Sequence, residues 1–351
     1  MAGSTFGEIL RMTTFGESHG EAVGVILDGV TPGVDIEEKD IQVQMDRRKP
    51  GQSSVTSPRK EYDIVRILSG VFEGKTTGTP MCVILYNKDM RPEAYDDIKR
   101  SFRPGHADFT YLKKYGIRDY RGSGRASGRE TAGRVAAGAI ARKLLERRGV
   151  QVVGYTTEIG GIRCGRFVET EIERNEVRAC DPEAAVAMIE KIKQLASVGD
   201  SCGGIVECTI RGAIPGLGEP VFDKLDAELA KAMLSIGAVK GIEFGAGFSA
   251  SAMRGSEHND PMSASGFASN HSGGIVGGIS TGQDIVFRVA VKPTSSISVP
   301  QNTIGIDGEE RVIVTQGRHD PCICPRIVPV VEAMACLVLE DHYKRHAALH
   351  G

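Results

Sequence analysis

Hydrophobic and polar residues alternate along several short segments, which is the pattern of half-buried strands. Between residues 285 and 291, Ile285, Phe287, Val289 and Val291 would face one side while the residues between them face the other. The same reasoning predicts strands over 150–159 and 202–210, and a short apolar strand over 24–28 followed by a glycine turn.

Other segments carry apolar residues at helical spacing, and capping signals mark where they begin. Ser127-Gly-Arg-Glu130 matches a capping box that opens a helix through about Arg148, and Asp181-Pro182 opens another that stops at Gly199. In this second helix we expect four residues to face the core: Val186, Ile189, Ile192 and Leu195. Further helices are predicted over 35–46, 223–236 and 329–342. Because helices and strands do not alternate strictly, the pattern favours an α+β fold in one large domain, residues 1–351.

Composition narrows the class of protein. The chain has 44 glycines in 351 residues without a collagen period, which is typical of turns and ligand-binding loops. There is no tryptophan and aromatic content is 5%, which disfavours a base-stacking surface. The first twenty residues lack a basic start and an apolar run, so we expect no signal peptide, and no apolar stretch is long enough to predict a membrane span. The eight cysteines lack metal-site spacing, so the sequence predicts free thiols in the cytoplasm and no bound metal.

Charge is unevenly distributed although the net charge is only −2. Residues 99–134 contain ten Lys and Arg against three acidic residues, a net charge of +7 that leaves −9 for the rest. A focused positive field in a nearly neutral protein suits a small, multiply charged anion better than a nucleic acid. By charge alone, a solvated basic face is an equal alternative.

Two histidines lie in glycine-containing loops. His19 stands in Gly16-Glu-Ser-His-Gly20, and His106 in Arg103-Pro-Gly-His-Ala-Asp108, where Asp108 can fix the tautomer of the ring. Imidazole titrates near neutral pH and therefore suits proton transfer. Each histidine taken alone also fits an ordinary loop position.

Three further motifs fit an anionic ligand. Glycines before the helix at Ser127 would let backbone N–H groups approach an anion, with Arg125 and Arg129 beside them. Residues 292–296, Lys-Pro-Thr-Ser-Ser, follow a predicted strand and supply hydroxyls and amides. Asp320, in Arg318-His-Asp-Pro321, is either a salt-bridged structural carboxylate or a buried base.

Taken together and in this order, these motifs closely resemble those of the chorismate synthase family from end to end. The resemblance also includes Asp46-Arg-Arg-Lys-Pro-Gly-Gln52, the run from Gly122 to Ala132, and Gly273-Gly-Ile-Val-Gly-Gly-Ile-Ser280. It implies a β-α-β sandwich in which sheets flank central helices, and a homotetramer. It also implies conversion of 5-enolpyruvylshikimate 3-phosphate to chorismate by 1,4-anti elimination of phosphate, the last step of the shikimate pathway.

The resemblance also implies the cofactor and the site residues. Reduced FMN is needed without net redox change, and an external flavin reductase would supply it, with NADPH only as a possible source of reductant. His19 would assist the leaving phosphate, His106 would contact the reduced flavin, and Asp320 would take part in removing the ring proton. The FMN contacts carry over to Arg125, Ala126, Ser127, Gly237, Ala238, Gly277, Lys292, Pro293, Thr294, Ser295, Ser296 and Arg318. The arginines expected at the substrate or NADPH are Arg47, Arg48, Arg103, Arg129 and Arg134.

Two positions depart from the family pattern. Many relatives have asparagine where this chain has Gly237, and the arginine usually found six residues after Arg48 is Ser54 here. The second difference argues against a role for pyridine nucleotide. The rival enzyme hypothesis is an NADPH-consuming flavin oxidoreductase. The alternative hypothesis that is not an enzyme is an RNA-binding module. It would leave the histidine loops unexplained.

Overall fold

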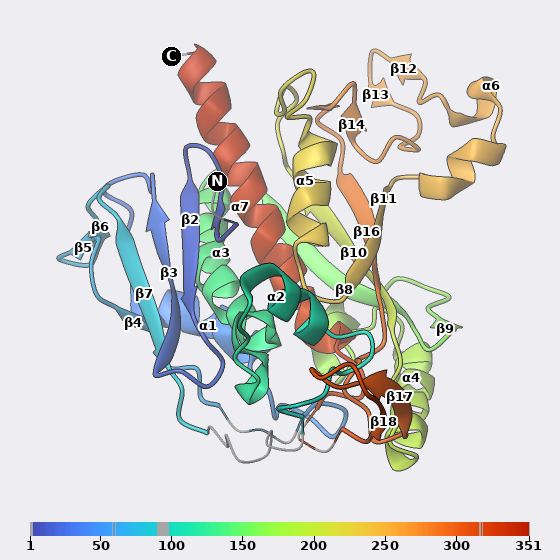
Figure 1. Ribbon diagram of the computed structural model, residues 1–351. Coiled ribbons are helices and arrows are strands. Elements are labelled where there is room, and N and C mark those ends of the chain that lie inside the picture. Colours follow the sequence, from blue (N-terminus) through green and yellow to red (C-terminus); the bar gives the residue numbers. More distant parts are fainter. Residues whose placement is uncertain are drawn as a thin grey trace.

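Two five-stranded antiparallel sheets form two layers, with helices between them (Figure 1). The computed structural model describes residues 3–57, 59, 61–89, 98–315, 317 and 319–350. The N-terminal sheet has the order β1-β2-β3-β7-β4, with bounds Thr5–Phe6, Arg11–Gly16, Ala22–Asp28, Met81–Tyr86 and Arg66–Ile67. The second sheet has the order β11-β16-β10-β8-β9, with bounds Val239–Phe244, Ile285–Val291, Gly204–Arg211, Gln151–Ile159 and Ile162–Arg163.

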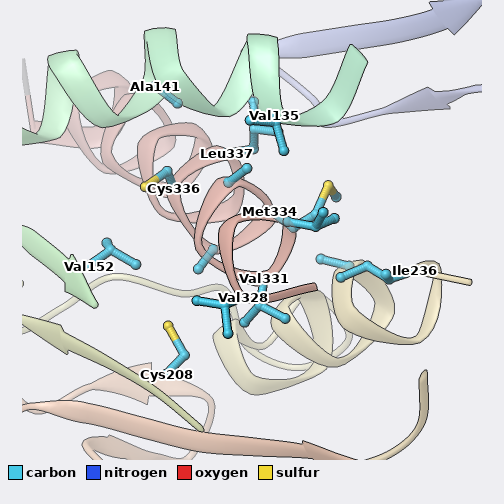
Figure 2. Close-up of a cluster of buried hydrophobic side chains, with 14 of the residues drawn as sticks. Val135, Ala141, Val152, Cys208, Ile236, Val328, Val331, Met334, Cys336 and Leu337 are labelled. Carbon is cyan, nitrogen blue, oxygen red and sulfur yellow. The ribbon is translucent and has the colours of Figure 1, made fainter. Parts of the chain in front are cut away.

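Two helices, α3 (Thr131–Glu146) and α7 (Cys324–His350), pack against each other between the sheets. Helix α3 faces β3 of the N-terminal sheet, and α7 faces β8 and β10 of the second sheet. The helices approach closely because α3 has a glycine at the contact: a Cβ at Gly138 would lie 2.3 Å from the Cβ of Ala333. Figure 2 shows α3 on one side of α7 and the strands of the second sheet on the other, with buried side chains filling the space. One continuous apolar core therefore joins both sheets.

The remaining elements surround this framework. Helix α1 (Glu38–Arg48) packs on α3, and α5 (Leu225–Leu234) packs on α7 and β11. Around them are α2 (Asp108–Tyr115), α4 (Pro182–Ser197), α6 (Gly255–His258) and four two-stranded pairs: β5 with β6 (Val71–Phe72, Lys75–Thr76), β12 with β13 (Met262–Ser263, Gly266–Phe267), β14 with β15 (Ile275–Val276, Ile279–Ser280) and β17 with β18 (Gln301–Ile304, Glu310–Ile313). Short 3₁₀ turns occur at η2 (Arg121–Ala126), η3 (Gly128–Glu130), η4 (Glu169–Arg174) and η5 (Gly247–Ala252). Over the described parts of the chain, no helix has the length and apolar character needed to cross a bilayer.

The predicted α+β class and the sheets flanking central helices are confirmed. The alternating strand at 285–291 has the predicted bounds and buries its four apolar residues. Helix α4 begins as predicted, with Asp181 accepting from the N–H groups of Glu183 and Ala184. The expectation for Val186 was wrong: it is 59% exposed, and Met188 lies in the core instead.

Helix α7 begins at Cys324 rather than near Pro329, so Pro329 lies inside the helix. The helix continues through this proline because a side chain from another segment replaces the missing backbone hydrogen bond. Proline has no N–H to donate to the carbonyl four residues earlier, here that of Pro325. The guanidinium of Arg178 donates to that carbonyl at 2.6 Å. A residue distant in sequence thus supplies the hydrogen bond that Pro329 omits.

Candidate active site

The loop between β2 and β3 buries His19, which is 7% exposed. The backbone N–H of Ser18 donates to the carbonyl of Gly124 at 3.3 Å. Gly122 packs on the imidazole so closely that a Cβ there would lie 2.1 Å from Nδ1. Gly122 also has φ +56°, a conformation that favours glycine. The glycine motif at 122–124 and the histidine motif at 16–20 therefore form one structure.

Charged groups of both signs lie near His19. Burial and the neighbouring Arg59 lower the pKa of His19 to about 4, although Asp119 and Glu61 act in the opposite direction. Arg59 reaches the hydroxyl of Ser18 at 3.5 Å and pairs with Glu61 at 2.7 Å. At neutral pH the imidazole is therefore neutral in the protein without ligand.

Two arginines from different elements meet at one buried carboxylate beside this loop. Arg48, at the end of α1, and Arg129, in η3, both pair with Asp63. All three side chains are at most 3% exposed. Burial alone would raise the pKa of Asp63, but the two guanidinium groups hold it below its ordinary value. Burial lowers the pKa of Arg48 to about 10, with Asp63 opposing the shift.

Three arginines near His19 and Asp63 retain buried donor groups that have no partner among the residues that the structure describes. Among the described residues, Arg48 Nε, Arg59 Nε and Arg129 Nη2 are buried and have no hydrogen-bond partner. A buried donor without a partner costs about 1–3 kcal/mol. Guanidinium groups bind phosphate and carboxylate strongly, so an anion that accepted these bonds would remove the cost.

Asp320 adjoins the same cluster. It is 8% exposed, accepts from the backbone N–H of Ser57 at 2.7 Å and pairs with Arg326 at 2.5 Å. Arg326 in turn donates to the carbonyl of Arg48 at 3.2 Å. Asp320 is therefore salt-bridged, and the same contact places it next to the arginine cluster.

His106 lies in a second polar group. Its Nδ1 is 3.2 Å from the carboxylate of Asp108. Arg103 donates to both oxygens of the same carboxylate, from Nε at 2.8 Å and from Nη2 at 3.0 Å. Burial lowers the pKa of His106; Asp108 opposes this, and Arg103 and Lys292 add to it. The ring is thus neutral at pH 7, with Nδ1 directed to the carboxylate.

Arg103 connects the two histidine groups. Its Nη2 donates to Ser123 at 2.8 Å, directly beside Gly122, and its Nη1 reaches Ser296 at 3.3 Å. The backbone N–H of Lys292 donates to the carbonyl of Ala238 at 2.9 Å. The structure thus brings the 292–296 segment and Ala238 to the His106 side of the site.

A line of contacts joins the other predicted FMN residues to this side. Arg125 contacts Thr14 at 2.8 Å and lies 4.0 Å from Glu130, which pairs with Arg134 at 2.8 Å. Arg134 also donates to Ser235 at 2.6 Å, two residues before Gly237. Ala126 and Ser127 continue from Arg125, and the Ser127 hydroxyl accepts from the N–H of Arg129 at 3.3 Å.

Some predicted residues lie elsewhere. The side chain of Arg47 pairs with buried Glu332 of α7 and with Glu173, and has no contact with the Arg48 cluster among the described residues. Gly277 lies in the β14–β15 turn near the start of α5, whereas Ala238 follows the end of that helix. Arg318 lies outside the described residues.

Ser54, which stands where the family usually has an arginine, is bound to an acidic residue in the structure. Its N–H and hydroxyl both bind the carboxylate of Glu176, at 3.1 and 2.8 Å. The positive charge that an arginine would present to a nucleotide phosphate is therefore missing at this position.

The sequence reasoning missed four residues of the site: Arg59, Asp63, Asn87 and Arg326. Arg59 and Asp63 lie between predicted elements, and Asn87 follows a strand that was not predicted. The only local signal was the concentration of charge over residues 59–63.

Comparison with known proteins identifies the family of this chain. A family model described as chorismate synthase matches residues 10–343. The chain belongs to the chorismate synthase family. It is 56% identical to a chorismate synthase of Methanosarcina mazei, over 98% of this chain and 97% of that protein. It is also 56% identical to the one of Syntrophobacter fumaroxidans, over 97% of each chain.

A crystal structure of a chorismate synthase shares the fold. Its TM-score is 0.78 at 30% sequence identity, and the match covers 97% of this chain and 93% of that one. The protein is therefore an enzyme of aromatic biosynthesis, a carbon–oxygen lyase, as the sequence motifs predicted.

Proposed function

We propose that this enzyme eliminates phosphate from 5-enolpyruvylshikimate 3-phosphate by the 1,4-anti route, giving chorismate, with reduced FMN as cofactor. The observation that carries the proposal is the cluster of buried arginines around Asp63 and His19, whose unused donors are suited to a phosphate and carboxylates. The substrate has these anionic groups, and the family membership supports the assignment.

His19 would act on the leaving group. It is neutral in the free protein, since burial and Arg59 lower its pKa to about 4. A phosphate dianion bound nearby would oppose both effects and raise this pKa, so the ring could take up a proton and hold it at the leaving oxygen. Arg48, Arg59 and Arg129 would stabilise the negative charge that develops there.

Asp320 would accept the proton from the substrate ring. Its carboxylate lies at the edge of the arginine cluster, where it is oriented by the N–H of Ser57 and by Arg326. A carboxylate kept in place in this way needs little reorganisation before proton transfer.

The residues on the His106 side fit a flavin phosphate and ring. Among the described residues, Thr294 has a buried hydroxyl without a partner, and burial lowers the pKa of the nearby Lys292 with help from Lys240. We propose that FMN is held by the predicted contacts on this side: Arg125, Ala126, Ser127, Gly237, Ala238 and Lys292 through Ser296. When bound, reduced FMN supplies electron density to the breaking C–O bond, which no side chain can provide. His106, whose Nδ1 faces Asp108, would offer Nε2 to the flavin.

The test is an anaerobic assay with reduced FMN and 5-enolpyruvylshikimate 3-phosphate, followed by chorismate absorbance and phosphate release. We expect many turnovers per flavin and no stoichiometric use of reductant. An NADPH-consuming flavin oxidoreductase would instead use one NADPH per product. Absence of chorismate with fully reduced flavin present would refute the proposal.

We also propose a single domain, a homotetramer, a cytoplasmic location and an external flavin reductase. The continuous core across both sheets supports the first. The eight free cysteines suit a reducing compartment, and family resemblance supports the tetramer. The glutamate-bound Ser54 supports a reductase separate from this chain.

A further inference from the structure

Asn87 lies directly after β7 and beneath the His19 loop, and it is 8% exposed. Its side-chain Nδ2 donates to the carbonyl of Glu17 at 3.0 Å and to that of Gly20 at 2.7 Å. These two carbonyls bracket His19 along the chain. Its backbone N–H donates to the carbonyl of Glu21 at 3.0 Å, so Asn87 makes hydrogen bonds to three residues of this loop.

The other half of the same amide faces the arginine cluster. Asn87 Oδ1 accepts from Arg129 Nε at 2.8 Å. Two carbonyls on one side and a guanidinium N–H on the other leave only one orientation of the amide that satisfies all three partners. The side chain therefore distinguishes its partners by hydrogen-bond direction.

We propose that Asn87 is a positioning residue for this reaction, which holds the His19 loop in place and ties it to the anion-binding Arg129. This rests on the role proposed above for His19. The loop is pressed from the opposite side by Gly122 and held there by the Ser18–Gly124 hydrogen bond. The His19 loop is thus packed between Asn87 and the glycine motif at 122–124.

The chain contains a matched control in Asn175. Its Nδ2 also donates to two loop carbonyls, those of Glu171 and Ala179 at 2.7 and 2.8 Å, and its Oδ1 accepts from the N–H of Ala179 at 2.9 Å. It therefore makes the same kind of three-way contact in the segment between η4 and α4, and none of its partners belongs to the site. A change at Asn175 measures the structural cost of losing such an amide.

The test uses the full-length protein with Asn87→Ala, Asn87→Asp and Asn175→Ala. Asn87→Asp keeps the shape and the acceptor for Arg129 but places an oxygen against the carbonyls of Glu17 and Gly20. Hydrogen exchange of the ligand-free protein should be roughly tenfold or more faster over residues 17–22 in both Asn87 variants, and unchanged in β10 and β16. Asn175→Ala should change exchange only near residues 171–180.

Steady-state kinetics supplies the second measurement, normalised to folded protein. We expect kcat of Asn87→Ala to fall about 10- to 100-fold, because a loop shift of an ångström misplaces His19. KM should change only a few-fold, since Arg129 keeps its ion pair with Asp63. Asn175→Ala should retain both constants.

The outcomes separate the two proposals. Normal loop exchange in both Asn87 variants, or faster exchange with unchanged kcat, would overturn the positioning role while wild-type turnover stands. If the wild type makes no chorismate, the proposed function fails, and the exchange data still show whether Asn87 holds the loop. If Asn87→Ala does not fold, the isosteric Asn87→Asp decides the question by the same two measurements.

Discussion

Replacing Asp63 with asparagine tests the buried charge balance of the site. Asp63 is fully buried and faces Arg48 and Arg129, so Asp63→Asn leaves two buried guanidinium groups without a counter-charge. Breaking a buried ion pair by removing one partner costs about 3–5 kcal/mol. Domains commonly have only about 5–15 kcal/mol of stability. We therefore expect a large decrease in the free energy of unfolding, measured by urea denaturation at pH 7.

The pH dependence of this effect has a definite sign. The pKa of Asp63 is lower in the folded protein than its ordinary value. The ionised carboxylate therefore makes its full contribution to the free energy of unfolding above the ordinary carboxyl pKa of about 4. It is lost as the pH falls toward the folded-state pKa. The difference between wild type and variant should therefore shrink below about pH 4.

Inorganic phosphate provides the functional half of the assay. If the arginines bind an anion, phosphate should stabilise both proteins and should stabilise Asp63→Asn more, because the anion replaces the missing charge. The matched control is Asp46→Asn, whose exposed pair with Lys49 should contribute no more than about 1 kcal/mol. A loss below about 1 kcal/mol in Asp63→Asn, or an equal response to phosphate in both proteins, would refute this reasoning.

Three further predictions concern individual steps. Gly122→Ala should lower kcat at least ~100-fold, since the added Cβ would lie 2.1 Å from the imidazole of His19. The control is Gly33→Ala, where φ is +73° and no atom lies within 4 Å of the added Cβ; it should lose stability but keep its turnover. Equal losses of turnover in the two variants would contradict the packing argument. On binding inorganic phosphate at pH 6, the wild type should take up more protons, or release fewer, than His19→Gln, because bound phosphate raises the pKa of His19 from about 4 and the variant has no such group. Calorimetry in buffers of different ionisation enthalpy measures the difference, and equal proton exchange in the two proteins would exclude His19 as the proton acceptor. Asp320→Asn should slow chorismate formation ~100-fold or more and enlarge the isotope effect of a substrate deuterated at the transferred position, and a wild-type rate and isotope effect would remove Asp320 from proton transfer.

The sequence predicted the parts of this protein that depend on neighbours along the chain. Alternation of apolar residues gave the strand at 285–291, and the Asp181-Pro182 cap gave the start of α4. The glycine, histidine and arginine motifs, with the family resemblance, also indicated the chemistry. Local patterns suffice for such features because pleat, helical turn and capping each involve residues a few positions apart.

Only the tertiary structure decided which charged groups share an environment. Arg47 and Arg48 are adjacent on α1, but successive helical positions point about 100° apart. Arg48 therefore reaches Asp63 in the site, whereas Arg47 reaches Glu332 in the core. Asn87 and Asp63 likewise acquire their roles only when β7, η3 and α1 meet, because hydrogen bonds and ion pairs act through space between residues that the sequence keeps far apart.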